Sequence, residues 1–321
     1  MVILGLVVLI LVAGLAGYLY FSRHGGTDVR EAGLIGRFYA PTGVKHRTAV
    51  LILGGSNGGF PYDSAAQDLS NAGYPTFAVA YFKNFMKQPD GVPGHLSNIP
   101  LEYFFHAIDW MKKRPEVNPD KIVLMGESRG GELVLLLASL RPDIAGVIAY
   151  SPSNVVWAGI ESPWNKPSWT LQEKPVPFLT STYTQGDGLL HMFKTALAKA
   201  TPQQLAAAAI PVENIRGPVL LISSKSDKLW PSSEMADNIE ARLTAHHFGY
   251  SIQNLQFSDS SHLLMGYGPG IVKMGIPFLF QMDFGGSKEG TRKARDTGWA
   301  AAKAFLRGVE DSGAENHRSD R

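Results

Sequence analysis

The chain has 321 residues, 45% hydrophobic and 18% charged, which is enough apolar material to bury a large core in one globular domain. Its formal net charge is +2 with both signs mixed along the sequence, unlike the basic stripe of a nucleic-acid-binding protein, so we expect no nucleic-acid partner. The absence of cysteine excludes disulfides and thiolate metal sites, and no P-loop or dinucleotide-binding motif is present, so neither metal nor cofactor is expected.

An uncharged apolar run covers residues 2–21 and is long enough to cross the roughly 30 Å core of a bilayer as a helix. A cleaved signal peptide normally begins with positive side chains, and here only the α-amino group precedes the run. We therefore favour a single-pass transmembrane anchor at residues 1–22 over a signal peptide. Arg23 and Arg30 follow it, which by the positive-inside rule places the domain after the anchor on the cytoplasmic side. Residues 23–30 are expected to be a linker.

Apolar, strand-like runs alternate with helical patterns through residues 31–309, the expected catalytic domain. The expected strands are 49–53, 76–81, 121–125, 145–150, 219–223 and 252–257, and the expected helices are 64–72, 101–113, 130–140, 233–245 and 292–307. This alternation predicts an α/β fold with a mostly parallel, doubly wound sheet. Residues 152–217 interrupt it and are expected to form a lid that recognises substrate, and residues 310–321 a disordered tail.

The stretch Gly126-Glu127-Ser128-Arg129-Gly130 lies between an expected strand and an expected helix. A G-x-S-x-G pattern in that context is typical of the nucleophile elbow of an α/β-hydrolase, where glycines leave the serine hydroxyl clear of the sheet. Ser128 is therefore the expected nucleophile, with an ordinary turn serine as the alternative. The side chains of Glu127 and Arg129 are expected to be structural, and Arg129 to be exposed in the first helical turn.

A second G-x-S-x-G stretch, at residues 54–58, also follows an apolar strand. Further glycine and then Pro61 come after it and oppose an immediate helix, so we interpret it as a glycine-rich loop. In α/β-hydrolases such a loop donates one backbone N–H to the oxyanion hole, and the residue after the nucleophile donates another. Ser56 or Asn57, together with Arg129, are the expected donors. A plain tight turn is the alternative.

Two later residues complete a candidate triad in the chain order acid, then histidine. Asp227 follows the expected strand at 219–223, and His262 follows the strand at 252–257 through a polar loop. Asp227 would orient the imidazole, and His262 would act as general base. Asp259 is a rival acid, but it lies so close to His262 that a loop-capping role is favoured. His106 lies in an expected helix, His246 and His247 at a helix end, His191 in the lid, and His24 and His317 in the tails.

Several segments together resemble a known family. They are residues 53–59, 99–104, 114–117, 126–132, 226–232, 261–262 and 284–286. In these segments the chain is similar to the catalytic domain shared by acyl-CoA thioesterases and bile acid-CoA:amino acid N-acyltransferases. The resemblance covers most of residues 48–308. It implies an α/β-hydrolase with Ser128, Asp227 and His262 as its triad and an activated acyl thioester as its substrate.

The nucleophile position separates hydrolysis from acyl transfer. The amino acid-conjugating members of the family carry cysteine there, whereas this chain has Ser128, so water is the expected acceptor and acyl-CoA hydrolysis the expected reaction. Three alternatives stay open: a carboxylesterase or dienelactone-hydrolase-like enzyme, an acyl-CoA:amino acid N-acyltransferase, and a membrane-tethered scaffold without activity. The expected partners are therefore a small acyl thioester or ester and, through the N-terminal helix, a membrane.

Overall fold

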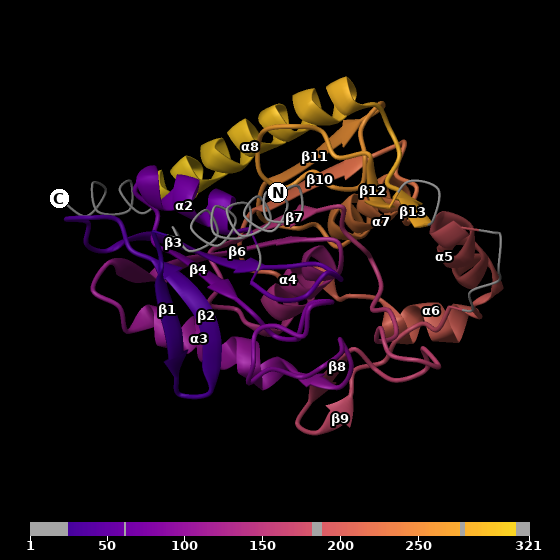
Figure 1. Cartoon of the computed structure of the whole chain (residues 1–321), viewed down its shortest axis with the longest axis horizontal. Helices are drawn as coiled ribbons and strands as arrows, with labels where there is room; N and C mark the ends of the chain where they lie inside the picture. Colours follow the sequence, from indigo (N-terminus) through magenta and orange to yellow (C-terminus); the bar gives the residue numbers. More distant parts are fainter. Residues whose placement is uncertain (1–24, 61, 182–187, 277–279, 313–321) are drawn as a thin grey trace, which may run out of the picture.

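A computed structural model of the chain describes residues 25–60, 62–181, 188–276 and 280–312 (Figure 1). Its centre is an eight-stranded sheet with the strand order β1-β2-β4-β3-β6-β7-β10-β11. The strands are β1 (Thr27–Glu31), β2 (Leu34–Tyr39), β3 (Arg47–Leu53), β4 (Thr76–Val79), β6 (Val117–Glu127), β7 (Gly146–Tyr150), β10 (Val219–Ser224) and β11 (Ile252–Phe257). β2 is antiparallel to both of its neighbours, and the other pairs are parallel. The predicted mostly parallel sheet is confirmed.

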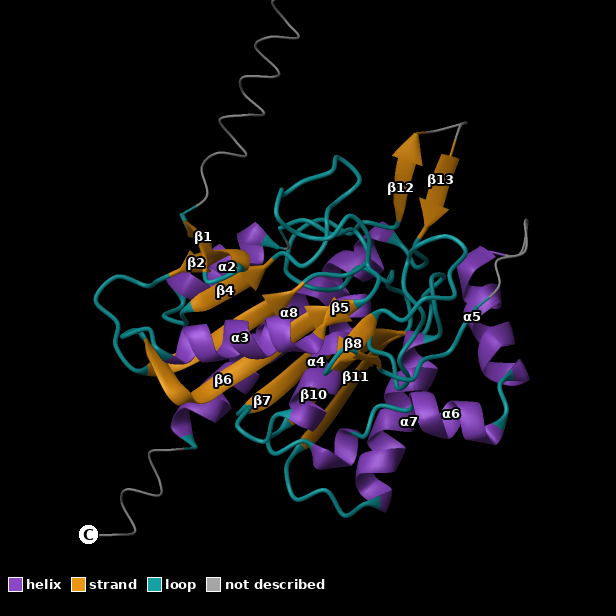
Figure 2. Ribbon diagram, turned by 90° about the horizontal axis from the view of Figure 1, so that it is seen from below, coloured by secondary structure: helices purple, strands orange, loops and turns teal. Residues whose placement is uncertain are grey.

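Helices cover both faces of this sheet (Figures 1 and 2). They are α2 (Asp63–Asn71), α3 (Leu101–Lys112), α4 (Arg129–Leu140), α7 (Ser232–Ala245) and α8 (Lys288–Asp311). Alternate residues of β3 enter different cores, because side chains of a strand point to opposite faces: Leu51 packs in the core under α3 and α4, and Ile52 in the core under α2 and α8. Central strands buried on both faces need continuous apolar runs, which is why the sequence revealed them.

The segment between β7 and β10 packs against α3, α4 and α7. It contains β8 (Trp169–Leu171), β9 (Lys174–Pro175), α5 (Gly188–Lys199), α6 (Pro202–Ala208) and the 3₁₀ turn η1 (Val212–Asn214), and β8 pairs with the short β5 (Ile99–Pro100). Its own small core joins Trp157 and the half-buried Phe193 to Trp230, which lies in the loop before α7. This insertion is the segment in which we expect the lid.

The expected boundaries need correction at both ends of the body. β1 begins at Thr27, inside the range expected to be a linker, and only its central Val29 is buried, so this edge strand gives no apolar signal. The last helix begins at Lys288 and extends to Asp311, so Glu310 belongs to α8 and not to the expected tail. A hairpin of β12 (Lys273–Ile276) and β13 (Phe280–Asp283) was also not expected.

The membrane anchor predicted at residues 1–22 and most of the tail predicted at 310–321 lie outside the described residues. In the parts of the chain that the structure describes, no helix has both the length and the apolar character needed to cross a bilayer.

Candidate active site

Ser128 lies at the corner between β6 and α4. Its backbone torsions are φ 60° and ψ −121°, a strained conformation that a non-glycine residue adopts at a nucleophile elbow. The Ser128 N–H donates to the Tyr150 carbonyl at 2.9 Å, which attaches the corner to the end of β7. The side chain is 8% exposed. The structure thus holds this serine in the turn that the sequence pattern predicts.

The glycines around Ser128 are required because the corner packs directly on backbone atoms. A Cβ on Gly126 would lie 2.3 Å from the Gly130 carbonyl oxygen, and a Cβ on Gly130 would lie 2.3 Å from the Leu53 carbonyl oxygen. Real Cβ atoms do not approach backbone oxygen so closely, so a side chain at either position would push α4 away from the sheet. The position of Ser128 would move with the helix.

His262 is held beside the same strand end. Its carbonyl accepts a hydrogen bond from Ser151 Oγ at 2.6 Å, and Ser151 directly follows the Tyr150 that binds the Ser128 backbone. The His262 N–H donates to the Phe284 carbonyl at 2.9 Å. The residue is 1% exposed, and its Nε2 has no hydrogen-bond partner among the described residues. One ring nitrogen is therefore available to a group that enters the site.

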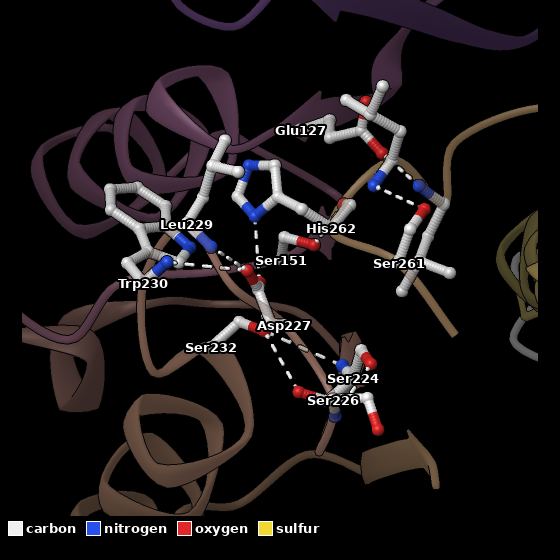
Figure 3. A network of polar contacts seen from close by, with 12 residues as sticks. Glu127, Ser151, Ser224, Ser226, Asp227, Leu229, Trp230, Ser232, Ser261 and His262 are labelled. Atoms are coloured by element: carbon white, nitrogen blue, oxygen red, sulfur yellow. Dashed lines mark hydrogen bonds and ion pairs between the residues drawn. The ribbon is translucent and has the colours of Figure 1, made fainter. Parts of the chain in front are cut away.

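Asp227 binds the other ring nitrogen (Figure 3). Its Oδ2 lies 2.7 Å from His262 Nδ1 and also accepts from Ser232 Oγ at 2.7 Å. Oδ1 accepts from the N–H groups of Leu229 and Trp230 at 2.8 and 3.3 Å. These donors come from the loop after β10 and the first turn of α7, and they fix the carboxylate in the orientation that the imidazole needs.

Two opposing effects act on the pKa of His262. Burial lowers it, but the charge and hydrogen bond of Asp227 and the charge of Glu127 outweigh burial, so the pKa lies above the ordinary value of a histidine. The charged imidazolium is the form that these carboxylates stabilise. A base that accepts a proton during a reaction benefits from that stabilisation.

The glycine-rich loop after β3 lies against Ser128. A Cβ on Gly55 would come 3.1 Å from the Glu127 carbonyl oxygen and 3.2 Å from Ser128 Cβ. Ser56 and Asn57 are exposed at the tip of this loop. Within the described residues, the N–H groups of Ser56, Asn57 and Arg129 have no hydrogen-bond acceptor. Gly55 thus brings the loop against Ser128, and the N–H groups of Ser56, Asn57 and Arg129 stay the predicted oxyanion donors.

Comparison with known proteins gives the family. The family described as BAAT / Acyl-CoA thioester hydrolase C terminal matches residues 99–309. The chain belongs to this family. The resemblance inferred from the sequence is therefore confirmed, and the matched region contains Ser128, Asp227 and His262.

The matched relatives include both hydrolases and transferases. Acyl-coenzyme A thioesterase 6 of Mus musculus is 30% identical over 222 residues, which cover 68% of this chain and 49% of the relative. Acyl-coenzyme A thioesterase 2, mitochondrial, of Mus musculus is 28% identical over 68% of this chain and 45% of the relative. Acyl-coenzyme A amino acid N-acyltransferase 2 of the same species is 24% identical over 87% and 64%. The chain spans about half the length of the thioesterases that it matches.

Solved structures establish the fold. A puromycin-hydrolysing peptidase of Mycobacterium tuberculosis has a TM-score of 0.56 at 13% identity, with 89% of this chain and 39% of that chain covered. A putative dienelactone hydrolase from Klebsiella pneumoniae has a TM-score of 0.51 at 13% identity, with 88% and 97% covered. At this identity the likeness concerns the fold alone, which is that of the α/β-hydrolases.

The expected exposure of Arg129 is wrong. In this member of the BAAT / acyl-CoA thioester hydrolase family the residue is 4% exposed, and its side chain forms an ion pair with Glu132 at 2.8 Å. Arg129 Nη2 also donates to the Trp157 carbonyl at 2.9 Å, and Glu132 accepts from Trp169 Nε1 at 2.8 Å. Burial raises the pKa of Glu132 to about 7, although Arg129 and Trp169 act in the opposite direction. The insertion after β7 covers this pair, so sequence alone gave no sign of its burial.

The alternative candidates for the acid and the base of the triad have different surroundings. Asp259 accepts from the N–H and hydroxyl of Ser287 at 2.9 and 2.6 Å, next to the first turn of α8, as its expected capping role requires. Among the described histidines only His262 is buried. The exposed ones are His46, His95, His106, His191, His246 and His247.

Sequence reasoning missed the glycine pair Gly285 and Gly286. Both have positive φ, 90° and 60°, and a Cβ on either would overlap backbone atoms of Ser226 or Ser260. The chain thus passes closely between the loop of Asp227 and the loop of His262, which only glycine permits. The pair belongs to segment 284–286, which the family resemblance had already singled out, and that was the available signal.

Proposed function

We propose that the chain is a serine hydrolase that cleaves acyl thioesters, with acyl-CoA as the substrate and a free fatty acid and CoA as products. The observation that carries the proposal is the buried His262, fixed at Nδ1 by Asp227, without a partner at Nε2, and held at the same end of β7 that binds the backbone of Ser128. A histidine oriented in this way can act as the base that activates a serine hydroxyl, and this supports Ser128 as the nucleophile.

In the proposed mechanism Ser128 Oγ attacks the acyl carbonyl while His262 Nε2 accepts its proton. The oxyanion is bound by the N–H of Arg129 and by the N–H of Ser56 or Asn57. Collapse of the intermediate breaks the carbon–sulfur bond, and the imidazolium protonates the leaving thiolate. His262 then takes a proton from water, which attacks the acyl-enzyme and releases the acid and Ser128. Asp227 keeps the imidazole in the required tautomer throughout.

A serine at the nucleophile position favours water over an amine as the acceptor. Family membership supports a thioester substrate, because the matched thioesterases and the N-acyltransferase are all named for acyl-coenzyme A. Carboxylic esters and lactones remain the second substrate class, since the fold is shared with a putative dienelactone hydrolase.

The decisive experiment is a thiol-release assay of the full chain with acyl-CoAs of increasing length. We expect release that depends on chain length and stops when a fluorophosphonate modifies Ser128. Aryl esters, lactones and acyl-CoA plus glycine are run in parallel. Faster turnover of esters or lactones would show that these are the substrates in place of acyl thioesters. Amide formation with glycine would show that the chain is an acyltransferase. A chain inert to every substrate and to the fluorophosphonate would support the scaffold without activity.

Membrane anchoring through residues 1–22, with the catalytic domain on the cytoplasmic side, stays a proposal that rests on the apolar run of the sequence. We expect the full chain to remain with membranes after alkaline carbonate extraction, and protease added to intact cells or vesicles to leave its C-terminal part uncut. Release by carbonate would contradict the anchor.

A further inference from the structure

Glu127, the residue before Ser128, is a buried carboxylate that the proposed chemistry does not use. It is the last residue of β6 and is 1% exposed. Its Oε1 accepts from the N–H groups of Leu264 and Met265 at 2.5 and 2.6 Å, and its Oε2 accepts from Tyr62 OH. Burying a carboxylate is costly unless its oxygens are satisfied, and here three donors satisfy them.

These contacts connect the two halves of the catalytic site. Leu264 and Met265 lie two and three residues after His262, so the carboxylate of Glu127 attaches the histidine loop to the residue that precedes the nucleophile. Ser151 and Phe284 hold the backbone of His262 itself. In Figure 3 Glu127 and Asp227 are seen in different directions from the His262 ring. Among these contacts, those of Glu127 join the histidine loop directly to the residue before Ser128.

The charge of Glu127 also reaches the imidazole. Together with Asp227 it raises the pKa of His262 against the effect of burial. The Glu127 charge also acts on Tyr62 before α2 and on Tyr150 of β7. Burial and this charge raise the pKa of both tyrosines well above the ordinary value, against the opposing charge of Arg295 on α8, so both are neutral. Glu127 is thus a second negative charge that the imidazolium experiences.

We infer that Glu127 is a positioning residue for the proposed reaction, which holds the His262 loop against the nucleophile elbow and stabilises the imidazolium that forms when Ser128 is deprotonated. This role goes beyond the triad and rests on the proposed function. It assigns to Glu127 a chemical effect that a carboxylate serving only to cap backbone N–H groups would not have.

The test separates the charge of Glu127 from its hydrogen bonds. In Glu127→Gln the amide oxygen can still accept from Leu264 and Met265, and the amide N–H can donate to the Tyr62 oxygen, so the contacts persist while the charge is lost. Glu127→Asp keeps the charge on a shorter side chain. The matched control is Asp68→Asn, because Asp68 on α2 accepts from Trp299 Nε1 at 2.7 Å and Lys303 Nζ at 3.1 Å and has no contact with His262.

The readout is the rate of Ser128 labelling by a fluorophosphonate as a function of pH, which needs no natural substrate. The base must be neutral, so labelling falls as pH drops through the pKa of His262. We expect the acid limb of the Glu127→Gln profile to move to lower pH, that of Glu127→Asp to stay closer to the unmodified chain, and that of Asp68→Asn to stay unchanged. An unmoved limb in Glu127→Gln, or an equal shift in Asp68→Asn, would overturn the inference.

Two measurements keep the result interpretable. In the unmodified chain the acid limb of the profile gives the reference pKa of His262 with which the variants are compared. Titration of the His262 ring by NMR, with its signal identified from its loss in His262→Gln, should report the same shift without turnover. If the unmodified chain is not labelled at Ser128, the proposed function fails, while the NMR comparison still decides the role of Glu127.

Discussion

The two G-x-S-x-G segments of this chain follow adjacent parallel strands, since Leu53 of β3 pairs with Gly126 of β6. Their serines nevertheless differ in burial, in backbone conformation and in the structure that follows them. Ser128 is nearly buried with a positive φ at the start of a helix, whereas Ser56 is exposed in a loop and the next helix begins only at Asp63. The pattern alone does not make an elbow; the residues that follow it do.

The glycines of the two segments have different tasks. Gly126 and Gly130 let α4 pack directly on the sheet, as their backbone contacts show. Gly58 and Gly59 have φ of 62° and 75° and turn the chain toward Phe82, whose carbonyl accepts from the Gly59 N–H at 2.9 Å. Gly126 and Gly130 are required for close approach alone, whereas Gly58 and Gly59 adopt the positive φ of a turn and Gly58 also lies close to the Lys83 carbonyl.

The serines give the largest expected contrast. Ser128→Ala should lower turnover by about 10⁴-fold or more, because it removes the nucleophile. Ser56→Ala should change turnover by less than about threefold, because any oxyanion donor there is a backbone N–H that alanine keeps. Steady-state thiol release by both variants measures the difference. Equal losses would show that the second segment carries chemistry in its side chain.

The residues that follow the serines should differ in stability. Arg129→Met leaves Glu132 buried without its cation and should lower the free energy of unfolding by about 3–5 kcal/mol. Asn57→Ala, at the equivalent place in the exposed loop, should stay within about 0.5 kcal/mol. Urea denaturation measures both, with the exposed ion-pair variant Arg292→Met as control. A change below 1 kcal/mol in Arg129→Met would contradict the structural role of the pair.

Gly55→Ala sharpens the comparison where the two segments touch. The new methyl group would lie 3.1–3.2 Å from Glu127 O and Ser128 Cβ, so one side must shift by a few tenths of an ångström. We expect turnover to fall about 10-fold with a stability change of about 1 kcal/mol or less, since catalysis is more sensitive to position than folding is. Gly94→Ala is the matched control, because a Cβ there meets nothing within 4 Å. Unchanged turnover in Gly55→Ala would show that the position of the glycine-rich loop does not affect catalysis.

The sequence predicted the centre of the fold well, for a physical reason. Strands buried on both faces must be apolar, and β10, buried along its whole length, was predicted at 219–223 and is observed at Val219–Ser224. The partly buried edge strand β11 was predicted with its observed bounds, Ile252–Phe257. Parallel strands end at one edge of the sheet, so residues that follow β6, β10 and β11 should gather there, and the contact of Asp227 with His262 agrees with that expectation. The catalytic roles of these residues stay predictions until the variants are measured.

Features that depend on distant partners were not predictable. The environment of Glu127 depends on Tyr62 and on Leu264, which is 137 residues away. Arg129 is buried because the irregular insertion covers it, and no periodic pattern encodes such a covering layer. The edge strand β1 buries only Val29, which is too little apolar character to separate a strand from a linker.

The final turn of α8 binds the first residues of β3. Glu310 Oε2 accepts from the buried Thr48 N–H at 2.7 Å, and its Oε1 pairs with Arg47 at 3.1 Å. A chain shortened before residue 310 would lose both contacts of Glu310 and leave the buried Thr48 N–H without an acceptor. The loosened strand is the one whose opposite end carries the glycine-rich loop beside Ser128. Trimming at the carboxyl terminus is therefore expected to disturb the catalytic edge from the far side of the sheet.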